Sequence, residues 1–403
     1  MRQLSQVALR LPILSTQSDM DNSLQHLIDQ IQAAATANTP LRIRGSGSKD
    51  FYGESLQGEV LDTRHHCGIT SYEPSELVVT ARGGTPLAEL EAALADKGQC
   101  LACEPPRFET PGAPGHPGGT VGGMVACGLS GPARASVGGL RDYVLGVQLI
   151  NGRAEHLTFG GQVMKNVAGY DVSRVMVGAL GTLGVLTDVS LKVLPVAPAE
   201  ATLVFEVDQA RALSQLHAWG AQPLPLNASC WVHDTTAPNA PELLFVRLRG
   251  ARAAVESACT RMVADLPGTR MDTAQACADW TACRDLALPF FNQVPALLES
   301  PVLWRLSVPQ TTPALALPWP QFIEWHGGLR WLWASASDHP TIRQAAASAG
   351  GNATLFRATN PGDKRATSIF YALASNLLQI HRRLKAEFDP AGIFNRGRLH
   401  PDF

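Results

Sequence analysis

The sequence lacks features that mark several whole classes of protein. No run of about 18 uncharged apolar residues occurs, so we expect no transmembrane helix. The 33 Lys and Arg residues nearly balance the 35 Asp and Glu residues, for a net charge of −2. This balance argues against nucleic acid as the main partner, because phosphate neutralisation needs a strongly basic surface. The N-terminal residues 1–18 lack a sustained apolar core and a small-residue cleavage site, so we expect a cytoplasmic chain without a secretory signal.

Cysteine is sparse as well. Eight cysteines in 403 residues are too few for a disulfide scaffold. Cys100 and Cys103 form the only CxxC pair, and no second pair completes a zinc or iron–sulfur ligand set. The run His65-His66-Cys67 could be considered as a metal site or as a point of covalent flavin attachment. Neighbouring residues on a strand point to opposite faces, however, so the three side chains could not easily share one ligand. We therefore favour a surface turn for this run. We therefore expect reduced thiols and no metal site.

Glycine is distributed unevenly, and its distribution predicts how the chain divides. Residues 101–200 hold 18 of the 36 glycines, whereas residues 201–300 hold three. The glycine-rich part ends near two prolines, Pro195 and Pro198, which are typical of a boundary. The chain is also too long for one ordinary core. We expect a first domain over 1–198, a second over 199–355, and a C-terminal segment over 356–403.

Hydrophobic periodicity predicts a mixture of helices and strands. In the second half it favours a sheet with helices on one face. Residues 144–150 and 154–159 predict a hairpin with a type I′ turn at Asn151-Gly152. The other expected helices are 21–37, 86–97, 171–179, 209–219, 251–264, 341–349 and 369–388, and the other expected strands are 41–44, 60–62, 69–72, 77–81, 185–194, 246–248, 304–308 and 329–333.

Three glycine clusters follow strands or begin helices. They are Arg44–Ser48, Gly118–Ala126 and Gly178–Val185. Glycine adopts positive φ and lets a ligand come close to the backbone. Consecutive backbone N–H groups, or the N-terminus of a helix, bind anions. Such loops can therefore bind a pyrophosphate without a lysine. No GxxxxGK[ST] sequence occurs, which excludes a P-loop. A Rossmann fingerprint is excluded too, because Gly45-Ser46-Gly47 has no third glycine at the required spacing.

The segment 41–195 resembles the FAD-binding domain of the vanillyl-alcohol oxidase / p-cresol methylhydroxylase type. It is still more similar to the E-subunit family of bacterial glycolate oxidases. The tail from Phe388 to Gly397 resembles the closing motif of the family, although Arg396 stands where relatives usually have proline, and 200–355 carry little of its signature. The stretches that carry the resemblance are LRIRGSGSK from Leu41, TVGGMVA from Thr120, GLRDYVLG from Gly139, GGQVMKNVAGYD from Gly160 and GTLGV from Gly181.

This resemblance implies an α+β fold. It comprises a two-subdomain FAD-binding domain of the p-cresol methylhydroxylase type, a smaller α+β cap domain, and a tail that returns to the FAD domain. It also implies that FAD binds noncovalently, because Ser48 stands where many relatives carry the histidine that is attached to the flavin. The implied contacts are Gly45, Ser46, Gly47, Ser48 and Lys49 around the pyrophosphate, Thr120, Gly122 and Gly123 at the phosphates or ribityl chain, and Gly181, Leu183, Gly184 and Val185 beside the isoalloxazine or adenine.

The resemblance further implies a role in oxidising glycolate or D-lactate to the 2-oxo acid. The chain would be one subunit of a glycolate oxidase complex. It would work with a sister FAD-linked catalytic subunit and an iron–sulfur subunit, and partners could hold it at the inner face of the membrane. A stand-alone FAD-dependent 2-hydroxy-acid dehydrogenase and a non-catalytic scaffold subunit remain as alternatives.

No catalytic residue is predicted. His326 is the single histidine kept from the metal cluster of catalytic relatives, so no complete metal site is expected. A structural role beside Trp331 is favoured for Arg330 over carboxylate binding. A polar set, Lys165, Asn166, Tyr170 and Asp171, either borders the flavin or a partner or caps the helix that follows.

Overall fold

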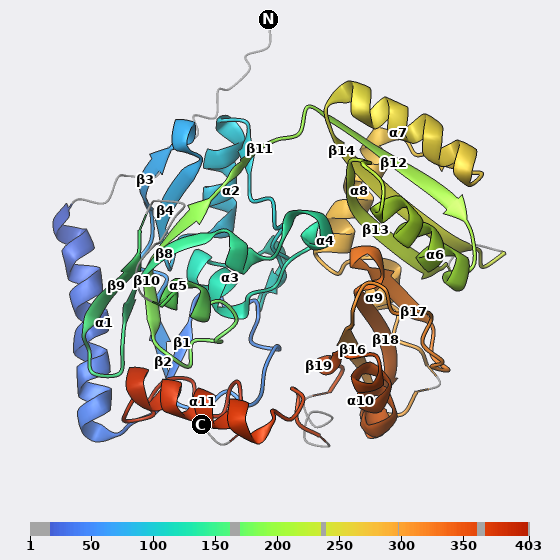
Figure 1. Ribbon diagram of the computed structural model, residues 1–403. Helices are drawn as coiled ribbons and strands as arrows, with labels where there is room; N and C mark the ends of the chain where they lie inside the picture. The colour runs from blue at the N-terminus through green and yellow to red at the C-terminus, as the bar shows by residue number, and fades with distance from the viewer. Residues whose placement is uncertain (1–16, 162–169, 235–238, 297, 361–366, 402–403) are drawn as a thin grey trace, which may run out of the picture.

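The computed structural model describes residues 17–161, 170–234, 239–296, 298–360 and 367–401. Figure 1 shows two bodies side by side, each built around a large sheet, with the last helix lying beneath the first body. The mixture of helices and antiparallel sheets confirms the predicted α+β class. No helix in the described ranges is both long and apolar enough to cross a membrane.

The first sheet has five antiparallel strands in the order β3-β4-β10-β8-β9. The helices α2 (Leu87–Asp96) and α3 (Val121–Cys127) pack on it, and Leu87, Leu90 and Leu94 are buried against strand residues such as Val79. The strands are β3 (Ile69–Glu73), β4 (Val78–Arg82), β10 (Val185–Lys192), β8 (Val144–Ile150) and β9 (His156–Gly160). This packing fixes the start of α3 beside the end of β4.

The predicted hairpin is confirmed as the pair β8–β9, but its tight two-residue turn is wrong. Ile150 pairs with His156, so five residues form the turn. The side chain of Asn151 explains the longer loop. Its Oδ1 accepts hydrogen bonds from the backbone amides of Arg153, at 2.9 Å, and Glu155, at 3.0 Å, which stabilises a wider turn.

A smaller parallel pair stands beside this sheet and begins the candidate site. It consists of β1 (Leu41–Arg44) and β2 (Glu59–Asp62), covered by α1 (Gln17–Ala37). Leu27 and Ile31 of α1 are buried, as the apolar spacing predicts. The remaining short elements of the first body are η1 (Pro74–Glu76), β5 (Gln99–Cys100), β6 (Glu109–Thr110), β7 (Ala113–Pro117), α4 (Arg134–Val137), η2 (Leu140–Asp142), α5 (Val172–Val175) and β11 (Leu194–Pro195).

The second body has an eight-stranded sheet in the order β15-β12-β14-β13-β17-β18-β16-β19. The expectation of helices on one face is wrong, because successive residues such as Cys230 and Trp231 pack in different cores. The helices α6 (Gln209–Gly220), α7 (Arg252–Asp265) and α10 (His339–Ser348) cover one face, and α8 (Thr273–Arg284) and α9 (Pro289–Asn292) the other. The strands are β12 (Ala199–Glu206), β13 (Leu226–His233), β14 (Glu242–Gly250), β15 (Thr269–Arg270), β16 (Pro301–Ser307), β17 (Gln321–Glu324), β18 (Leu329–Ser335) and β19 (Asn352–Ala358), with η3 (Trp325–Gly327) and η4 (Ala336–Asp338) between them.

After β19, which ends three residues beyond the expected limit of 355, the chain returns to the first body. Helix α11 (Ser375–Phe388) begins six residues later than predicted. Ile369 stays extended because its amide donates to Glu54 Oε1 at 2.6 Å and its carbonyl accepts from Leu355 N at 3.0 Å. The residues after α11 pack against β1, where Leu41 bridges to Phe394.

Candidate functional site

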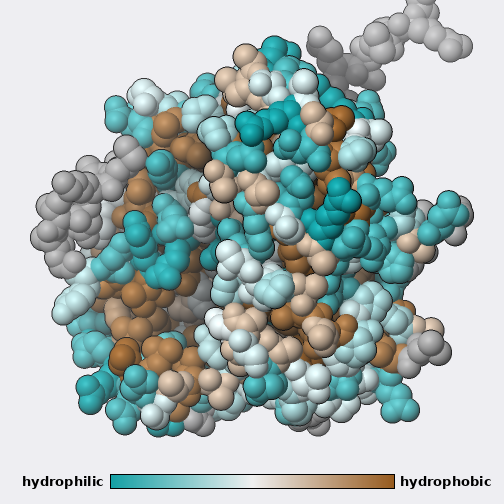
Figure 2. Space-filling view, turned by 45° about the vertical axis from the view of Figure 1, so that its right-hand side comes forward, coloured by the Kyte–Doolittle hydropathy of each residue, from teal (hydrophilic) through white to brown (hydrophobic). Residues whose placement is uncertain are grey.

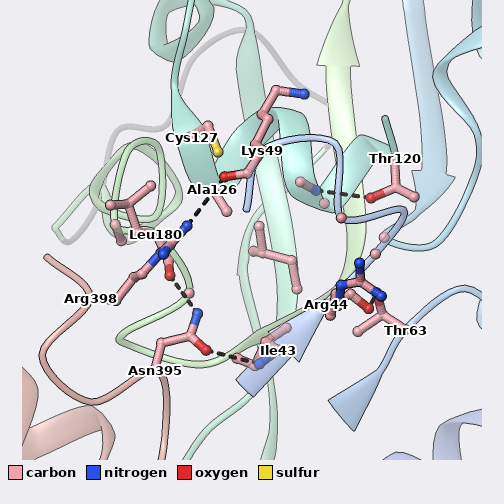
Figure 3. A pocket seen from close by; sticks show the side chains of 18 of the residues that line it. Ile43, Arg44, Lys49, Thr63, Thr120, Ala126, Cys127, Leu180, Asn395 and Arg398 are labelled. Atoms are coloured by element: carbon pink, nitrogen blue, oxygen red, sulfur yellow. Dashed lines mark hydrogen bonds between the residues drawn. The ribbon is translucent and has the colours of Figure 1, made fainter. Parts of the chain in front are cut away.

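A cleft opens beside β1 (Figure 3). Most of its wall comes from the loop after β1, the start of α3, the loop before β10 and the C-terminal tail. Val185 does not line the cleft, because its side chain is fully buried in the core under α1. The cleft brings together Gly45, Ser46, Gly47, Ser48, Lys49, Thr120, Gly122, Gly123, Gly181, Leu183 and Gly184, which are the other residues predicted to hold FAD.

The loop after β1 presents a row of unpaired backbone amides. Within the described ranges, the N–H groups of Ser46, Gly47, Ser48 and Lys49 donate to no protein acceptor. Gly47 has φ +77°, a conformation that L side chains rarely adopt, so this turn depends on glycine. Successive free amides in such a turn form a concave nest for an anion. The loop therefore fits a pyrophosphate, which offers several acceptor oxygens and two negative charges.

The wall at the start of α3 contributes in another way. Thr120 Oγ1 accepts from the amide of Gly123 at 3.2 Å, and the amide of Gly122 donates to Gly83 O at 2.8 Å. These two amides are thus engaged within the protein. Gly45 lies so close to Thr120 that a Cβ at this position would clash with Thr120 Oγ1. The start of α3 therefore lets a ligand come close to the backbone, whereas the loop after β1 supplies the free hydrogen-bond donors.

Two residues of the tail, which were not predicted from the sequence, complete the cleft. Asn395 donates from Nδ2 to Leu180 O at 2.6 Å and accepts at Oδ1 from Ile43 N at 2.9 Å, so it joins two walls (Figure 3). Arg398 donates to the backbone oxygens of Lys49, at 3.2 Å, and Asp50, at 3.1 Å. The closing motif pointed to this part of the chain, but nothing in it indicated a position more than 340 residues away in the sequence.

The rest of the cleft is largely apolar. Leu180 and Leu183 are nearly buried and Met176 lies beside them. A surface of this kind suits a planar ring system, since it excludes water without demanding hydrogen bonds. The cleft thus combines a nest that suits a pyrophosphate with an apolar surface that suits a planar ring. A flavin dinucleotide contains both of these groups.

The family follows from sequence comparison. Residues 22–160 match the model of the FAD binding domain. Over 378 residues the chain is 43% identical to glycolate oxidase subunit GlcE of Escherichia coli (strain K12), which covers 94% of this chain and 97% of that protein. The chain belongs to the GlcE family. The predictions of FAD as the cofactor and of an FAD-dependent oxidoreductase are confirmed by these matches.

Two further comparisons define what this GlcE-family chain shares with more distant proteins. It is 28% identical over 178 residues to glycolate oxidase subunit GlcD of Bacillus subtilis (strain 168), covering 44% of this chain and 36% of that one. The solved structure of 4-ethylphenol oxidase from Gulosibacter chungangensis superposes with a TM-score of 0.65 at 13% identity, covering 94% of this chain and 87% of that one. The second match shows a shared fold only.

Lys49 is a second unusual feature of the GlcE-family cleft. Its side chain is buried, and its ammonium lies 5.6 Å from the centroid of the Phe108 ring. Within the described part of the chain its Nζ has no hydrogen-bond or ion-pair partner. Burial lowers the pKa of Lys49, while the nearby Cys127 thiol favours the charged form. A buried cation without an anion suits a site that receives a negatively charged ligand.

The other polar candidates have structural partners. His326 is hydrogen-bonded to Ser136 and Ser229, at 3.1 and 3.0 Å, and burial lowers its pKa to about 4, so the imidazole is neutral.

The structural role favoured for Arg330 is confirmed, because it donates to three backbone carbonyls. Asp171 caps α5 by accepting from the amide of Arg174 at 3.1 Å. Lys165 and Asn166 lie outside the described residues, and Tyr170 is exposed. The run His65-His66-Cys67 follows a turn, as predicted, in which His65 is exposed, but the His66 side chain is buried beside Asp188.

Proposed function

We propose that this chain is the FAD-binding subunit of a glycolate oxidase or dehydrogenase complex that oxidises glycolate or D-lactate to the 2-oxo acid. The observation that carries the proposal is the nest of free amides over residues 46–49, in a chain that matches a glycolate oxidase subunit along nearly its whole length. In the same proposal, 1–198 and 356–403 hold the cofactor, and 199–355 form the cap.

The residues of the cleft would act by binding and orientation. Bound FAD supplies hydride and single-electron transfer. The amides of Ser46 to Lys49 neutralise the pyrophosphate, and the apolar wall excludes water from the ring. Ser48 offers no imidazole for a covalent link, so the flavin is held noncovalently. Asn395 and Arg398 hold the loops of the cleft in place, because each of them forms hydrogen bonds with the backbone of a different wall.

Electrons would pass from this chain to other subunits. We propose a sister FAD-linked catalytic subunit and an iron–sulfur subunit as partners, with the complex in the cytoplasm at the inner face of the membrane. Support for a sister subunit comes from the Bacillus subtilis relative, whose name gives it as a different subunit of a glycolate oxidase. The similarity of the two chains is consistent with two flavoproteins in one assembly.

The visible absorption spectrum of the purified chain tests this function. Yellow protein that glycolate and D-lactate reduce only after partner subunits are added is the expected result. Yellow protein that either acid reduces rapidly in the absence of partners would instead identify a stand-alone dehydrogenase. Colourless protein that takes up no added FAD would overturn the proposal and leave a scaffold role.

A further inference from the structure

The second body carries a pocket of its own, a cavity of about 290 Å³ between its sheet and the helices α8 and α9. All of the residues that line it lie between 202 and 333, so none belongs to the cofactor cleft or to the first body. A cavity of about 150 Å³ inside a protein can hold benzene. The pocket is therefore large enough for a ligand with two fused rings, and no step of the proposed function uses it.

Aromatic side chains form much of the wall, and their polar groups are already engaged. The indole N–H of Trp280 donates to Thr202 Oγ1 at 2.9 Å. That of Trp333 donates to the backbone oxygen of Phe290 at 2.8 Å. The rings of Phe290 and Phe322 pack with their centroids 5.3 Å apart. These contacts hold the rings in place, and such a wall suits a flat apolar ligand.

Part of this apolar wall is not covered by the protein itself. Val232 on β13 and Phe290 on α9 line the pocket and are only partly buried, whereas their chain neighbours Trp231 and Phe291 are almost completely buried. A ligand in the pocket would remove this remaining apolar surface from water, which favours binding.

The charged side chains of the pocket carry one sign. They are the carboxylates of Asp234, which follows β13, and Asp279, on α8, and no Lys or Arg is among the described residues that line the pocket. Asp279 Oδ1 accepts from Gln275 Nε2 at 2.8 Å, and within the described ranges its Oδ2 has no hydrogen-bond partner. The cofactor cleft differs, because it is lined by Arg44, Lys49 and Arg398. The pocket of the second body therefore disfavours anions and favours a cation.

We propose that this pocket binds a flat apolar amine. Its ring system would lie among the aromatic side chains between the sheet and α9, and its ammonium group would donate to the free oxygen of Asp279. A hydrogen bond between two charged groups is stronger than one between neutral groups. The proposal goes beyond the proposed function and does not depend on it, because neither FAD nor a hydroxy acid takes part.

Calorimetric titration of the full-length, FAD-loaded chain with 1-naphthylmethylamine tests the pocket. This probe combines two fused rings with an amine that is protonated at neutral pH. We expect it to bind at one site. The neutral 1-naphthalenemethanol should bind at least about tenfold more weakly, because it cannot form the charged pair. The anion 1-naphthoate should not bind, because its carboxylate would face Asp234 and Asp279.

Asp279→Asn tests the charged pair. This variant should bind the amine about tenfold more weakly and the alcohol as the parent does, because only the amine interacts with the carboxylate. A loss of affinity for both probes alike would contradict the role of Asp279.

Val232→Trp tests the location, because the larger side chain would fill the cavity. We expect it to lose the amine and to keep FAD, as seen in its visible spectrum. Val263→Trp is the matched control, since Val263 is exposed on α7, which covers the opposite face of the sheet, and this variant should bind the amine as the parent does.

Unchanged amine binding in Val232→Trp would overturn the proposal. So would no amine binding by the parent, or equal affinity of the parent for the amine and for 1-naphthoate. If Val232→Trp does not fold, Asp279→Asn and the comparison of the three probes still decide. A chain that binds the amine but takes up no FAD would refute only the proposed function.

Discussion

The carboxylate of Glu104 accepts hydrogen bonds from the guanidinium of Arg247 with both of its oxygens, at 2.7 and 2.8 Å. Glu104 belongs to the first body and Arg247 to β14 of the second sheet, so this pair clamps the two together. Arg249 adds a bond of 2.8 Å to the same carboxylate. Burial alone would raise the pKa of Glu104, but the two guanidinium groups hold it below its ordinary value.

Glu104→Gln should therefore destabilise the protein markedly. The change leaves the buried Arg247 without its counterion, and breaking a buried pair in this way costs about 3 kcal/mol. Urea denaturation measures the loss. Glu256→Gln is the control, because Glu256 pairs with Arg270 on the surface and its loss should cost less than about 1 kcal/mol. Equal effects of the two variants would contradict the clamp.

Gly47→Asp tests the pyrophosphate nest. A side chain here would begin against the Arg44 guanidinium in the wall of the cleft, so the new carboxylate would bring a negative charge next to the expected phosphates and the variant should purify without flavin. Gly47→Asn is the matched control, since asparagine has nearly the same shape, tolerates the same positive φ and carries no charge. We expect Gly47→Asn to retain clearly more FAD, as measured by the ratio of flavin to protein absorbance. Stoichiometric FAD in Gly47→Asp would refute the assignment.

Lys385 secures the tail under the cleft. Its ammonium bonds to Asp389 Oδ2 at 2.7 Å and to the backbone oxygens of Thr182, at 2.7 Å, and Phe394, at 2.8 Å. Lys385→Met would leave Asp389 buried without its partner and should cost about 3 kcal/mol and loosen FAD. The double variant Lys385→Met/Asp389→Asn should recover part of that loss. A double variant as unstable as the sum of the single ones would argue against coupling.

Glu324 predicts how stability depends on pH. Burial raises its pKa from 4.5 to about 7 in the folded protein. The folded state therefore holds this proton more tightly, so its contribution is complete below about pH 4.5 and is lost as the pH rises through about 7. The shift corresponds to about 3 kcal/mol at 1.36 kcal/mol per unit. Denaturation across this range should show the decline, and Glu324→Gln should reduce it. An identical slope in the variant would exclude Glu324 as the cause.

Local features of the fold could be predicted from the sequence. The apolar stripe of Leu27 and Ile31 marks α1, and the free amides around Gly47 follow from a glycine turn after a strand. The width of the β8–β9 turn could not be predicted, because a side chain, Asn151, sets it.

Contacts between residues that are far apart in the sequence could not be predicted. Nothing local in Asn395 indicates that it joins Ile43 to Leu180. Val232 and Asp279 are equally unremarkable in their own segments of the sequence. Only the fold places them on the walls of one pocket. Contacts between sheets and domains leave no pattern in the neighbouring sequence, so such sites can be recognised only in the folded structure.

The space-filling view shows apolar side chains at several places over the surface of the two bodies (Figure 2). The cofactor cleft differs from such surface because its last wall is supplied by residues 393–398. During synthesis, those residues are still inside the ribosome when the first body has already left it. Flavin capture should therefore wait until residues 393–398 have been made and have folded back onto the first body.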